Sequence, residues 1–295
     1  MMIKKLVTYE DMGLVQWGVL DETETGVYGA IALEEAFFTP LEFIRQGNEG
    51  LLALADALEQ NEKTHAVAAQ PLDTVRIMAP IPHVERNIFC IGKNYADHIA
   101  EFDKTAVPEL PKYPMIFTKA TTSVIGPDDL IDPHKNVTSA LDYEGELAVI
   151  IGKEGSDIPV GEAMDYVYGF TILNDVTARD LQANHSQWFH GKSLDTFCPM
   201  GPFLLLRDAA PDTFTVVTKV NGEVRQDATT GEFIFTIPQL IQTLSQGTTL
   251  LPGDIIATGT PSGVGVGFNP PKFIHSGDVV EISISDIGTL TNKVK

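Results

Sequence analysis

Cysteines, basic residues and long apolar runs are all scarce in this chain of 295 residues. Its 2 cysteines, Cys90 and Cys198, do not make a disulfide framework and suit a reducing compartment. Its 20 lysines and arginines stand against 40 aspartates and glutamates, which gives a formal net charge of −20. We therefore expect no binding to nucleic acid or to an anionic membrane surface, because both require clustered positive charge.

A membrane-spanning segment and a signal peptide are not expected either. No run approaches the ~18 apolar residues of a spanning helix. Lys4 and Lys5 near the start are not followed by the long apolar stretch of a secretory signal. The hydrophobic content of 43% and the charged content of 20% are those of an ordinary globular protein. Together these features favour a cytoplasmic location.

The pattern of apolar residues and prolines divides the chain into two parts. Short strands are expected at Leu14–Leu20 and Gly26–Leu33, followed by one or two helices between Pro40 and Glu59. A polar stretch and then a proline-punctuated extended segment come after these helices. We therefore place a boundary near residue 80, which separates a small N-terminal α+β domain (1–80) from a larger domain (81–295).

The larger part is rich in strand patterns. The expected strands are Ile88–Ile91, Met115–Phe117, Leu147–Ile151, Tyr168–Leu173, Phe203–Leu206, Thr215–Val220, Ile255–Thr258 and Val279–Ile284. Asn221-Gly222 is typical of a two-residue hairpin turn. A short helix is expected from Ile237 to Leu244, with Thr236 as its N-cap. Many strands with few helices predict an α+β fold.

Three carboxylates stand inside or beside these apolar runs. Glu144 and Glu146 precede or enter the expected strand 147–151, and Asp175 follows the strand 168–173. Side chains two apart on a strand share a face, and two carboxylates that close repel each other unless a cation lies between them. A hard divalent ion with oxygen ligands is the natural candidate. The same spacing is also compatible with an exposed acidic face on an edge strand.

A histidine and a glutamate three residues apart form a second candidate site. His98 and Glu101 follow the strand 88–91, and they share one face if the segment after Tyr95 is helical. A carboxylate that orients a histidine ring makes it a general base. An incidental pair on a surface helix has the same spacing.

Two polar loops complete the candidate residues. Lys192 follows a glycine in a polar loop, where its ammonium could hold a substrate carboxylate; an exposed lysine is the simpler interpretation. A glycine-rich loop that ends at Gly267 contains Thr260 and can present backbone N–H groups to an anionic ligand. A dinucleotide site is excluded there, because Pro270 and Pro271 prevent a helix from opening after the glycines.

Taken in order, these motifs resemble the fumarylacetoacetate hydrolase family over about residues 84–295. The motifs that carry the resemblance are Gly92-Lys-Asn-Tyr-Ala-Asp-His98, Asp142-Tyr-Glu-Gly-Glu146, Asn174-Asp-Val-Thr-Ala-Arg-Asp180, Gly191-Lys-Ser-Leu-Asp195, Val220-Asn-Gly222 and Thr258-Gly-Thr-Pro-Ser-Gly263. The similarity is greatest to bacterial members with an extra N-terminal domain that act on oxaloacetate, and it extends to acylpyruvate hydrolases. The resemblance implies a β-rich mixed β-sheet roll and a homodimer.

The resemblance also implies roles for single residues. It implies a Mg²⁺ or Mn²⁺ site at Glu144, Glu146 and Asp175. It implies a catalytic pair, His98 and Glu101, on a segment that acts as a lid, and we expect residues 98–114 to be mobile without ligand. It implies substrate contacts from Gln182, Lys192 and Thr260, with Lys192 also counted among the catalytic residues. A further aspartate ligand of fumarylacetoacetase itself is replaced by Lys93-Asn94-Tyr95, so a three-carboxylate site is expected.

The expected function is metal-dependent cleavage of a C–C bond in a small 2-oxo acid through a metal-stabilised enolate. The expected reactions are oxaloacetate decarboxylation and acylpyruvate hydrolysis, which share that enolate and differ in whether water must attack. One alternative is an isomerase of unsaturated 2-hydroxy or 2-oxo dicarboxylates in aromatic-acid breakdown. Another is a non-catalytic scaffold that keeps the fold, although a scaffold has no need of the carboxylate trio.

Overall fold

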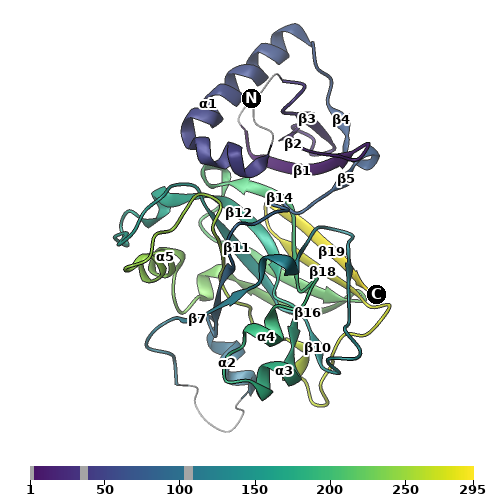
Figure 1. The fold of residues 1–295 in the computed structure, drawn as a ribbon, viewed down its shortest axis with the longest axis vertical. Coiled ribbons are helices and arrows are strands. Elements are labelled where there is room, and N and C mark those ends of the chain that lie inside the picture. Colours follow the sequence, from purple (N-terminus) through teal and green to yellow (C-terminus); the bar gives the residue numbers. More distant parts are fainter. Residues whose placement is uncertain (1–2, 34–38, 103–108) are drawn as a thin grey trace.

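The computed structural model describes residues 3–33, 39–102 and 109–295 (Figure 1). The N-terminal strands are β1 (Lys5–Asp11), β2 (Leu14–Leu20), β3 (Gly26–Gly29), β4 (Gln70–Pro71) and β5 (Arg76–Ile77). The later strands are β6 (Ile88–Gly92), β7 (Met115–Lys119), β8 (Val124–Ile125), β9 (Leu130–Ile131), β10 (Leu141–Asp142), β11 (Gly145–Ile151), β12 (Val167–Asn174), β13 (Thr177–Ala178), β14 (Cys198–Leu206), β15 (Thr215–Val220), β16 (Glu223–Thr229), β17 (Ile255–Ala257), β18 (Val279–Ile284) and β19 (Gly288–Val294). The helices are α1 (Pro40–Thr64), α2 (Ala96–Phe102), α3 (Arg179–Asn184), α4 (Phe189–Lys192) and α5 (Ile237–Ser245).

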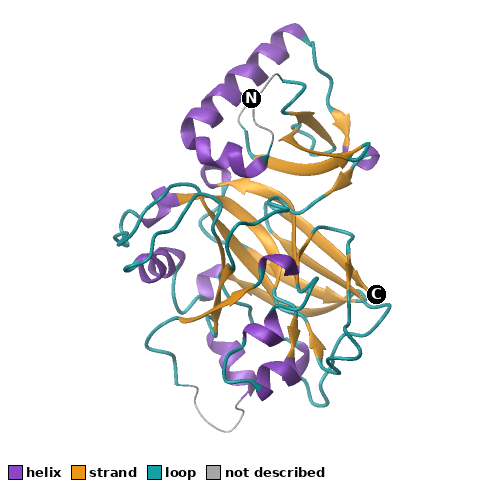
Figure 2. Ribbon diagram, in the orientation of Figure 1, coloured by secondary structure: helices purple, strands orange, loops and turns teal. Residues whose placement is uncertain are grey.

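The described strands form a large mixed sheet and a smaller one. The 12-stranded sheet has the order β4-β3-β2-β1-β14-β12-β11-β17-β6-β7, with β5 beside β1 and β8 beside β14. The 5-stranded sheet has the order β16-β15-β18-β19-β9, and β10 and β13 form a separate pair. Most neighbours are antiparallel, but β6 and β17 run parallel. Strands dominate the ribbon in Figure 2. The α+β fold with a mixed sheet is confirmed.

Strand β11 is buried on both faces, which explains its unbroken apolar run. Leu147, Val149 and Ile151 belong to a core shared with residues of β15, β18 and β19. Ala148 and Ile150 point the other way, into a core shared with β1, β2 and α1. The centre of the large sheet therefore lies between the smaller sheet and the N-terminal elements.

The N-terminal elements lie at one end of the molecule, above the rest in Figure 1. Their sheet is continuous with the larger part through the pairs Lys5↔Leu205 and Leu6↔Leu204 between β1 and β14. The ring of Trp17 stacks on that of Phe43, with 4.1 Å between centroids, and ties α1 to β2. A domain boundary near residue 80 stays a prediction.

Helix α1 begins where the sequence predicts and ends later than expected. Thr39 accepts a hydrogen bond from the Glu42 N–H (3.1 Å) and donates its own N–H to the Glu42 carboxylate (3.0 Å), a capping box. The helix continues to Thr64, through part of the stretch expected to be polar and irregular, with a kink at Gly47. Strand β3 is shorter than expected: it ends at Gly29 rather than at Leu33.

The predicted hairpin turn, the start of the short helix α5 and the helix after Tyr95 are confirmed. Asn221 and Gly222 both have positive φ, 51° and 79°, as a two-residue hairpin between β15 and β16 requires. The N–H of Thr236 donates to Gln239 Oε1 (2.8 Å) at the start of α5. The segment after Tyr95 is helical, as α2. None of the helices in the described ranges combines the length and apolar character that crossing a membrane requires.

Candidate active site

The pairing of β11 with β12 brings the three carboxylates together. Gly145 at the start of β11 lies opposite Asn174 at the end of β12. Glu144 and Asp175 flank this pair, and the Asp175 N–H donates to the Glu144 carbonyl (2.8 Å). Glu144, Glu146 and Asp175 are all buried, and each offers an oxygen within 4.8 Å of the others. The predicted cluster therefore exists, and an exposed acidic face is the wrong interpretation.

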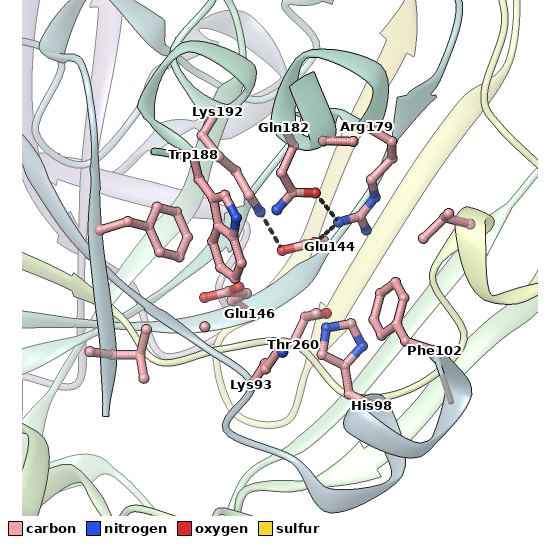
Figure 3. Close-up of a pocket in the computed structure, with 15 residues that line it drawn as sticks. Lys93, His98, Phe102, Glu144, Glu146, Arg179, Gln182, Trp188, Lys192 and Thr260 are labelled. Carbon is pink, nitrogen blue, oxygen red and sulfur yellow. Dashed lines mark hydrogen bonds and ion pairs between the residues drawn. The ribbon is translucent and has the colours of Figure 1, made fainter. Parts of the chain in front are cut away.

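Buried cations from other elements neutralise the cluster. Lys192 Nζ lies 2.7 Å from Glu144 Oε2 and 2.6 Å from Asp175 Oδ2. Arg179 Nη1 lies 2.7 Å from Glu144 Oε1. Figure 3 shows Lys192 and Arg179 reaching Glu144 from the same side. The repulsion expected between the carboxylates is thus relieved in part by an ammonium group between two of them.

Burial and the neighbouring charges shift the pKa values of the two glutamates in opposite directions. Burial raises the pKa of Glu144, but the charges of Lys192, Arg179 and His98 outweigh burial and lower this pKa to about 2. Burial and the charges of Asp175 and Glu144 raise the pKa of Glu146 well above its usual range, although Gly259 donates its N–H to Glu146 Oε2 (2.8 Å). Glu146 is therefore the carboxylate most in need of a further cation.

The donor set fits a hard divalent ion. All the ligand atoms offered are carboxylate oxygens, the type that Mg²⁺ and Mn²⁺ prefer. Three oxygens at ~2.1 Å from one ion lie within about 4.2 Å of one another, so separations up to 4.8 Å require only a small adjustment.

With Asp175 buried beside them, Glu144 and Glu146 open onto a pocket of about 380 Å³. Its polar lining comprises Lys93, His98, Glu144, Glu146, Arg179, Gln182, Lys192 and Thr260, and its apolar lining comprises Ile91, Phe102, Phe117, Ala183, Trp188 and Val266, with Gly92 between them. His98 lies across the pocket from Lys192 and Gln182 (Figure 3). A compact acid with two or three polar groups matches this lining better than a long apolar ligand does.

The histidine and the glutamate of α2 form a buried pair. His98 Nδ1 lies 2.5 Å from Glu101 Oε1, and their side chains are 8% and 12% exposed. An incidental surface pair is therefore the wrong interpretation. Because Nδ1 is engaged by the carboxylate, Nε2 is the nitrogen that remains to exchange a proton with a ligand. The expected mobility of residues 98–114 stays a prediction, and residues 103–108 of that segment lie outside the described part.

The three expected substrate contacts all line the pocket, but they differ in what they can still bind. Gln182 accepts a hydrogen bond from Arg179 through Oε1 (3.2 Å), which leaves its amide NH₂ for a ligand. The Thr260 hydroxyl donates to the Gly145 carbonyl (3.0 Å) and accepts from Gln226 (2.7 Å). Lys192 is buried rather than exposed, and it is shared between two carboxylates. Thr260 therefore supports the strand beside the site as much as it faces the pocket.

Several residues of the site do not follow from the sequence patterns. Arg179 bonds Asp142 through Nε (2.8 Å), and its buried Nη2 has no hydrogen-bond partner in the described ranges. Lys119, from the edge strand β7, is fully buried and lies 2.6 Å from Asp175 Oδ1. The signal for Lys119 is weak: one lysine at the end of an apolar run, with no nearby partner in sequence.

An aromatic wall covers the lysine end of the pocket. The rings of Phe117 and Trp188 meet edge to face, with 5.3 Å between centroids, and Lys192 Nζ lies 5.1 Å from the Phe117 centroid. Gly92 makes room for this wall, since a Cβ there would lie 2.7 Å from the Trp188 ring. The wall limits the access of water to the ammonium group.

Comparison with known proteins identifies the chain. A model of the fumarylacetoacetate (FAA) hydrolase C-terminal family matches residues 87–295. The chain belongs to the fumarylacetoacetate hydrolase family. One family relative is oxaloacetate tautomerase YisK of Bacillus subtilis (strain 168), which is 55% identical over 225 residues, 76% of this chain and 74% of the relative.

Solved structures of family members share the whole fold. A fumarylacetoacetate hydrolase from psychrophilic Exiguobacterium antarcticum is 40% identical, with a TM-score of 0.81 and coverage of 99% of both chains. A probable 2-hydroxyhepta-2,4-diene-1,7-dioate isomerase from Mycobacterium abscessus is 32% identical, with a TM-score of 0.77 and coverage of 99% of this chain and 98% of the other. These similarities to named enzymes support an enzymatic activity. They do not choose between a hydrolase, a decarboxylase and an isomerase.

Proposed function

We propose that this chain interconverts the enol and keto forms of a small 2-oxo dicarboxylic acid of the oxaloacetate class. The observation that carries the proposal is that His98 and two members of the carboxylate trio, Glu144 and Glu146, line one pocket, with Asp175 buried beside them. The 55% identity to an oxaloacetate tautomerase supports this choice among the reactions open to the family.

The proposal includes a divalent ion, Mg²⁺ or Mn²⁺, held by Glu144, Glu146 and Asp175. Such an ion would supply the Lewis acidity that polarises the 2-oxo group and lowers the energy of the enolate. The rest of the catalytic work falls to the side chains of this chain.

Cationic and amide groups would hold the substrate. Arg179, whose Nη2 has no partner in the described ranges, and the amide NH₂ of Gln182 lie at the same end of the pocket (Figure 3), where they would donate to a substrate carboxylate. Lys192 adds positive charge that the chain, at −20 overall, otherwise lacks. Phe117 and Trp188 keep water from this end of the site.

The proton would move through His98. Tautomerisation removes the proton of the enol oxygen and places one on the neighbouring carbon, with no net change in atoms. In that step His98 Nε2 takes the proton of the enol oxygen, Glu101 stabilises the charged ring through Nδ1, and Nε2 then delivers a proton to the carbon of the resulting enolate. In the reverse direction the same nitrogen removes the proton.

The C–C cleavage expected from the sequence starts from the same enolate chemistry and competes with this proposal. In decarboxylation the bond to the distal carboxylate breaks, CO₂ leaves and the enolate is protonated at carbon. In acylpyruvate hydrolysis, water adds to the distal carbonyl and the C–C bond then breaks, so His98 must first take a proton from water. The isomerase alternative moves a double bond along an unsaturated dicarboxylate, and the similarity to a probable isomerase of that kind favours it as the second candidate.

One experiment separates these reactions. Freshly dissolved enol oxaloacetate is followed by ultraviolet absorbance and by proton NMR with Mg²⁺ or Mn²⁺, alongside an acylpyruvate and an unsaturated 2-hydroxy dicarboxylate. Faster loss of the enol without extra pyruvate supports the tautomerase. Pyruvate formation above the metal-only rate supports cleavage instead. No acceleration with any of the three would refute the proposal. Size measurement of the same sample tests the homodimer, which we also propose.

A further inference from the structure

The backbone N–H groups of the glycine-rich loop, residues 263–267, bind carboxylates. These carboxylates are side chains of the protein itself. The Gly263 N–H donates to Glu101 Oε2 (2.9 Å). The N–H groups of Gly265 and Val266 donate to the two oxygens of Asp142 (2.7 and 3.0 Å). The external ligand expected for this loop is thus replaced by two internal carboxylates. One of them is the partner of His98.

The space occupied by Glu101 exists because residue 267 has no side chain. A Cβ at Gly267 would lie 2.1 Å from Glu101 Oε2 and 2.7 Å from its carboxyl carbon. The backbone at Gly267 is not left-handed, and the three atoms nearest to an added Cβ all belong to the side chain of Glu101. Gly263 is different: its φ is +104° and a Cβ would lie 1.8 Å from the Arg225 carbonyl, so the turn itself requires glycine.

Helix α2 cannot orient the pair alone. It contains only 7 residues, and helices of two turns are marginal without outside contacts. Glu101 ties the helix to the loop through Oε2 and holds His98 Nδ1 through Oε1. The position of the loop therefore affects the orientation of the His98 ring through a single carboxylate, that of Glu101.

We propose that Gly267 is a positioning residue for the His98–Glu101 pair. The empty volume at Gly267 and the N–H of Gly263 fix the Glu101 carboxylate. That carboxylate then fixes the tautomer and orientation of His98, with Nδ1 protonated and Nε2 turned to the ligand. The predicted effect on rate rests on the proposed function, whereas the effect on His98 itself does not.

The first test measures the tautomer of His98 directly. ¹⁵N NMR of the full chain reports which ring nitrogen of His98 carries the proton. We expect one tautomer in the natural protein and a mixture in Gly267→Ala, because the displaced carboxylate no longer selects Nδ1–H. Gly161→Ala is the matched control, since a Cβ at Gly161 meets nothing within 4 Å. Glu101→Gln, which adds no atom to the loop, should alter His98 in the same direction.

The second test reads catalysis. We expect Gly267→Ala to lower kcat by at least ~10-fold, with the ~10²–10⁴-fold loss of a missing general base as the upper limit, while KM changes little. In a Glu101→Ala background the same substitution should cause no further loss, because the side chain with which it collides is gone.

Two results would overturn the positioning role: unchanged His98 signals in Gly267→Ala, or a further loss of kcat in the Glu101→Ala background. If Gly267→Ala unfolds the protein, recovery of the fold in the double variant supports the contact, and failure to recover overturns it. If His98 responds as expected but the natural protein converts no 2-oxo acid, the proposed function fails and the positioning role stands.

Discussion

The two walls of the pocket are built in opposite ways. One wall carries Glu144, Glu146 and Asp175 at the ends of β11 and β12, strands in which every residue is buried. Its carboxylates are held by cations that arrive from β7, α3 and α4. The other wall is the short helix α2, and in the described ranges the hydrogen bond that ties its His98–Glu101 pair to another element runs through the carboxylate of Glu101.

This difference matches the roles proposed for the two walls. A divalent ion demands ligand oxygens placed to within a few tenths of an ångström, which strands in the middle of a sheet provide. A proton donor needs its geometry only while a ligand is bound, so a short helix with one strong attachment suffices. The predictions below test this division, beginning with the largest expected effect.

Breaking the carboxylate wall should remove the activity. Glu146→Ala deletes a ligand of the proposed ion while β11 keeps its apolar core, so the fold should remain. We expect metal-dependent turnover and metal affinity to fall by more than ~100-fold, beyond the effect of losing an outer partner of a ligand. Calorimetric titration with Mn²⁺ and an activity assay check this, with the exposed Glu154→Ala as control. Normal turnover by Glu146→Ala, or by the natural protein in excess chelator, would contradict the role of this wall.

Breaking the helical wall should damage only the steps that transfer a proton. We expect His98→Ala to lower tautomerisation and acylpyruvate hydrolysis by ~10²–10⁴-fold and to leave metal affinity unchanged. Decarboxylation of oxaloacetate needs no attacking water, so it should fall less. All three rates are measured on one preparation. An equal loss in all three would assign His98 to a step that they share, such as protonation of the enolate.

Removing the ammonium between the carboxylates should test the rigidity of the first wall. Lys192→Met leaves Glu144 and Asp175 buried without their shared cation, which typically costs about 3–5 kcal/mol of unfolding free energy. Urea unfolding in chelator measures this loss, with the exposed Lys63→Met as control. Added Mg²⁺ should recover part of the loss, because an ion that binds only the folded state stabilises it. A variant as stable as the natural protein would show that the cluster does not depend on Lys192.

The smallest expected effect is on hydrogen exchange. Oxalate, which mimics a 2-oxo acid enolate, should raise the protection of amides in α2 more than in β11, where both neighbouring strands already protect the backbone. Mass spectrometry with and without oxalate compares peptides over 96–102 and 145–151. Equal, high protection of both peptides in both states would show that the two walls are equally fixed.

Local patterns in the sequence predicted much of the fold. The apolar run 147–151 became β11, and Asn221-Gly222 became a hairpin, because periodicity and turn chemistry act over a few residues. The end of α1 was predicted too early, because polar contacts hold its last turns: Lys63 pairs with Glu59 (2.6 Å), and the side chain of Asn61 bonds the backbone of Val67. Leu52 is 67% exposed, because it lies two residues from the buried Leu54 and therefore faces away from the core on the helix.

The sequence predicted the carboxylates of the site but not the residues that pair with them. Glu144, Glu146 and His98 occur in short motifs, so the sequence points to them directly. Lys119 and Asp175 are 56 positions apart and meet only once β7 has folded against the sheet. The glycine-rich loop was expected to bind an anionic ligand. One of the carboxylates that it binds instead is Glu101, which is 162 positions from Gly263. Such long-range pairs carry no local signal.

The join between β1 and β14 has a consequence for solubility. Strand β14 pairs with β12 along one side, and on the other side β8 and β1 share its length. Without β1, the backbone N–H and C=O groups near Leu204 and Leu205 would form a bare, apolar sheet edge, the kind of surface that recruits strands from other molecules. Strand β1 therefore protects the protein against aggregation. A fragment of residues 81–295 would lack this protection.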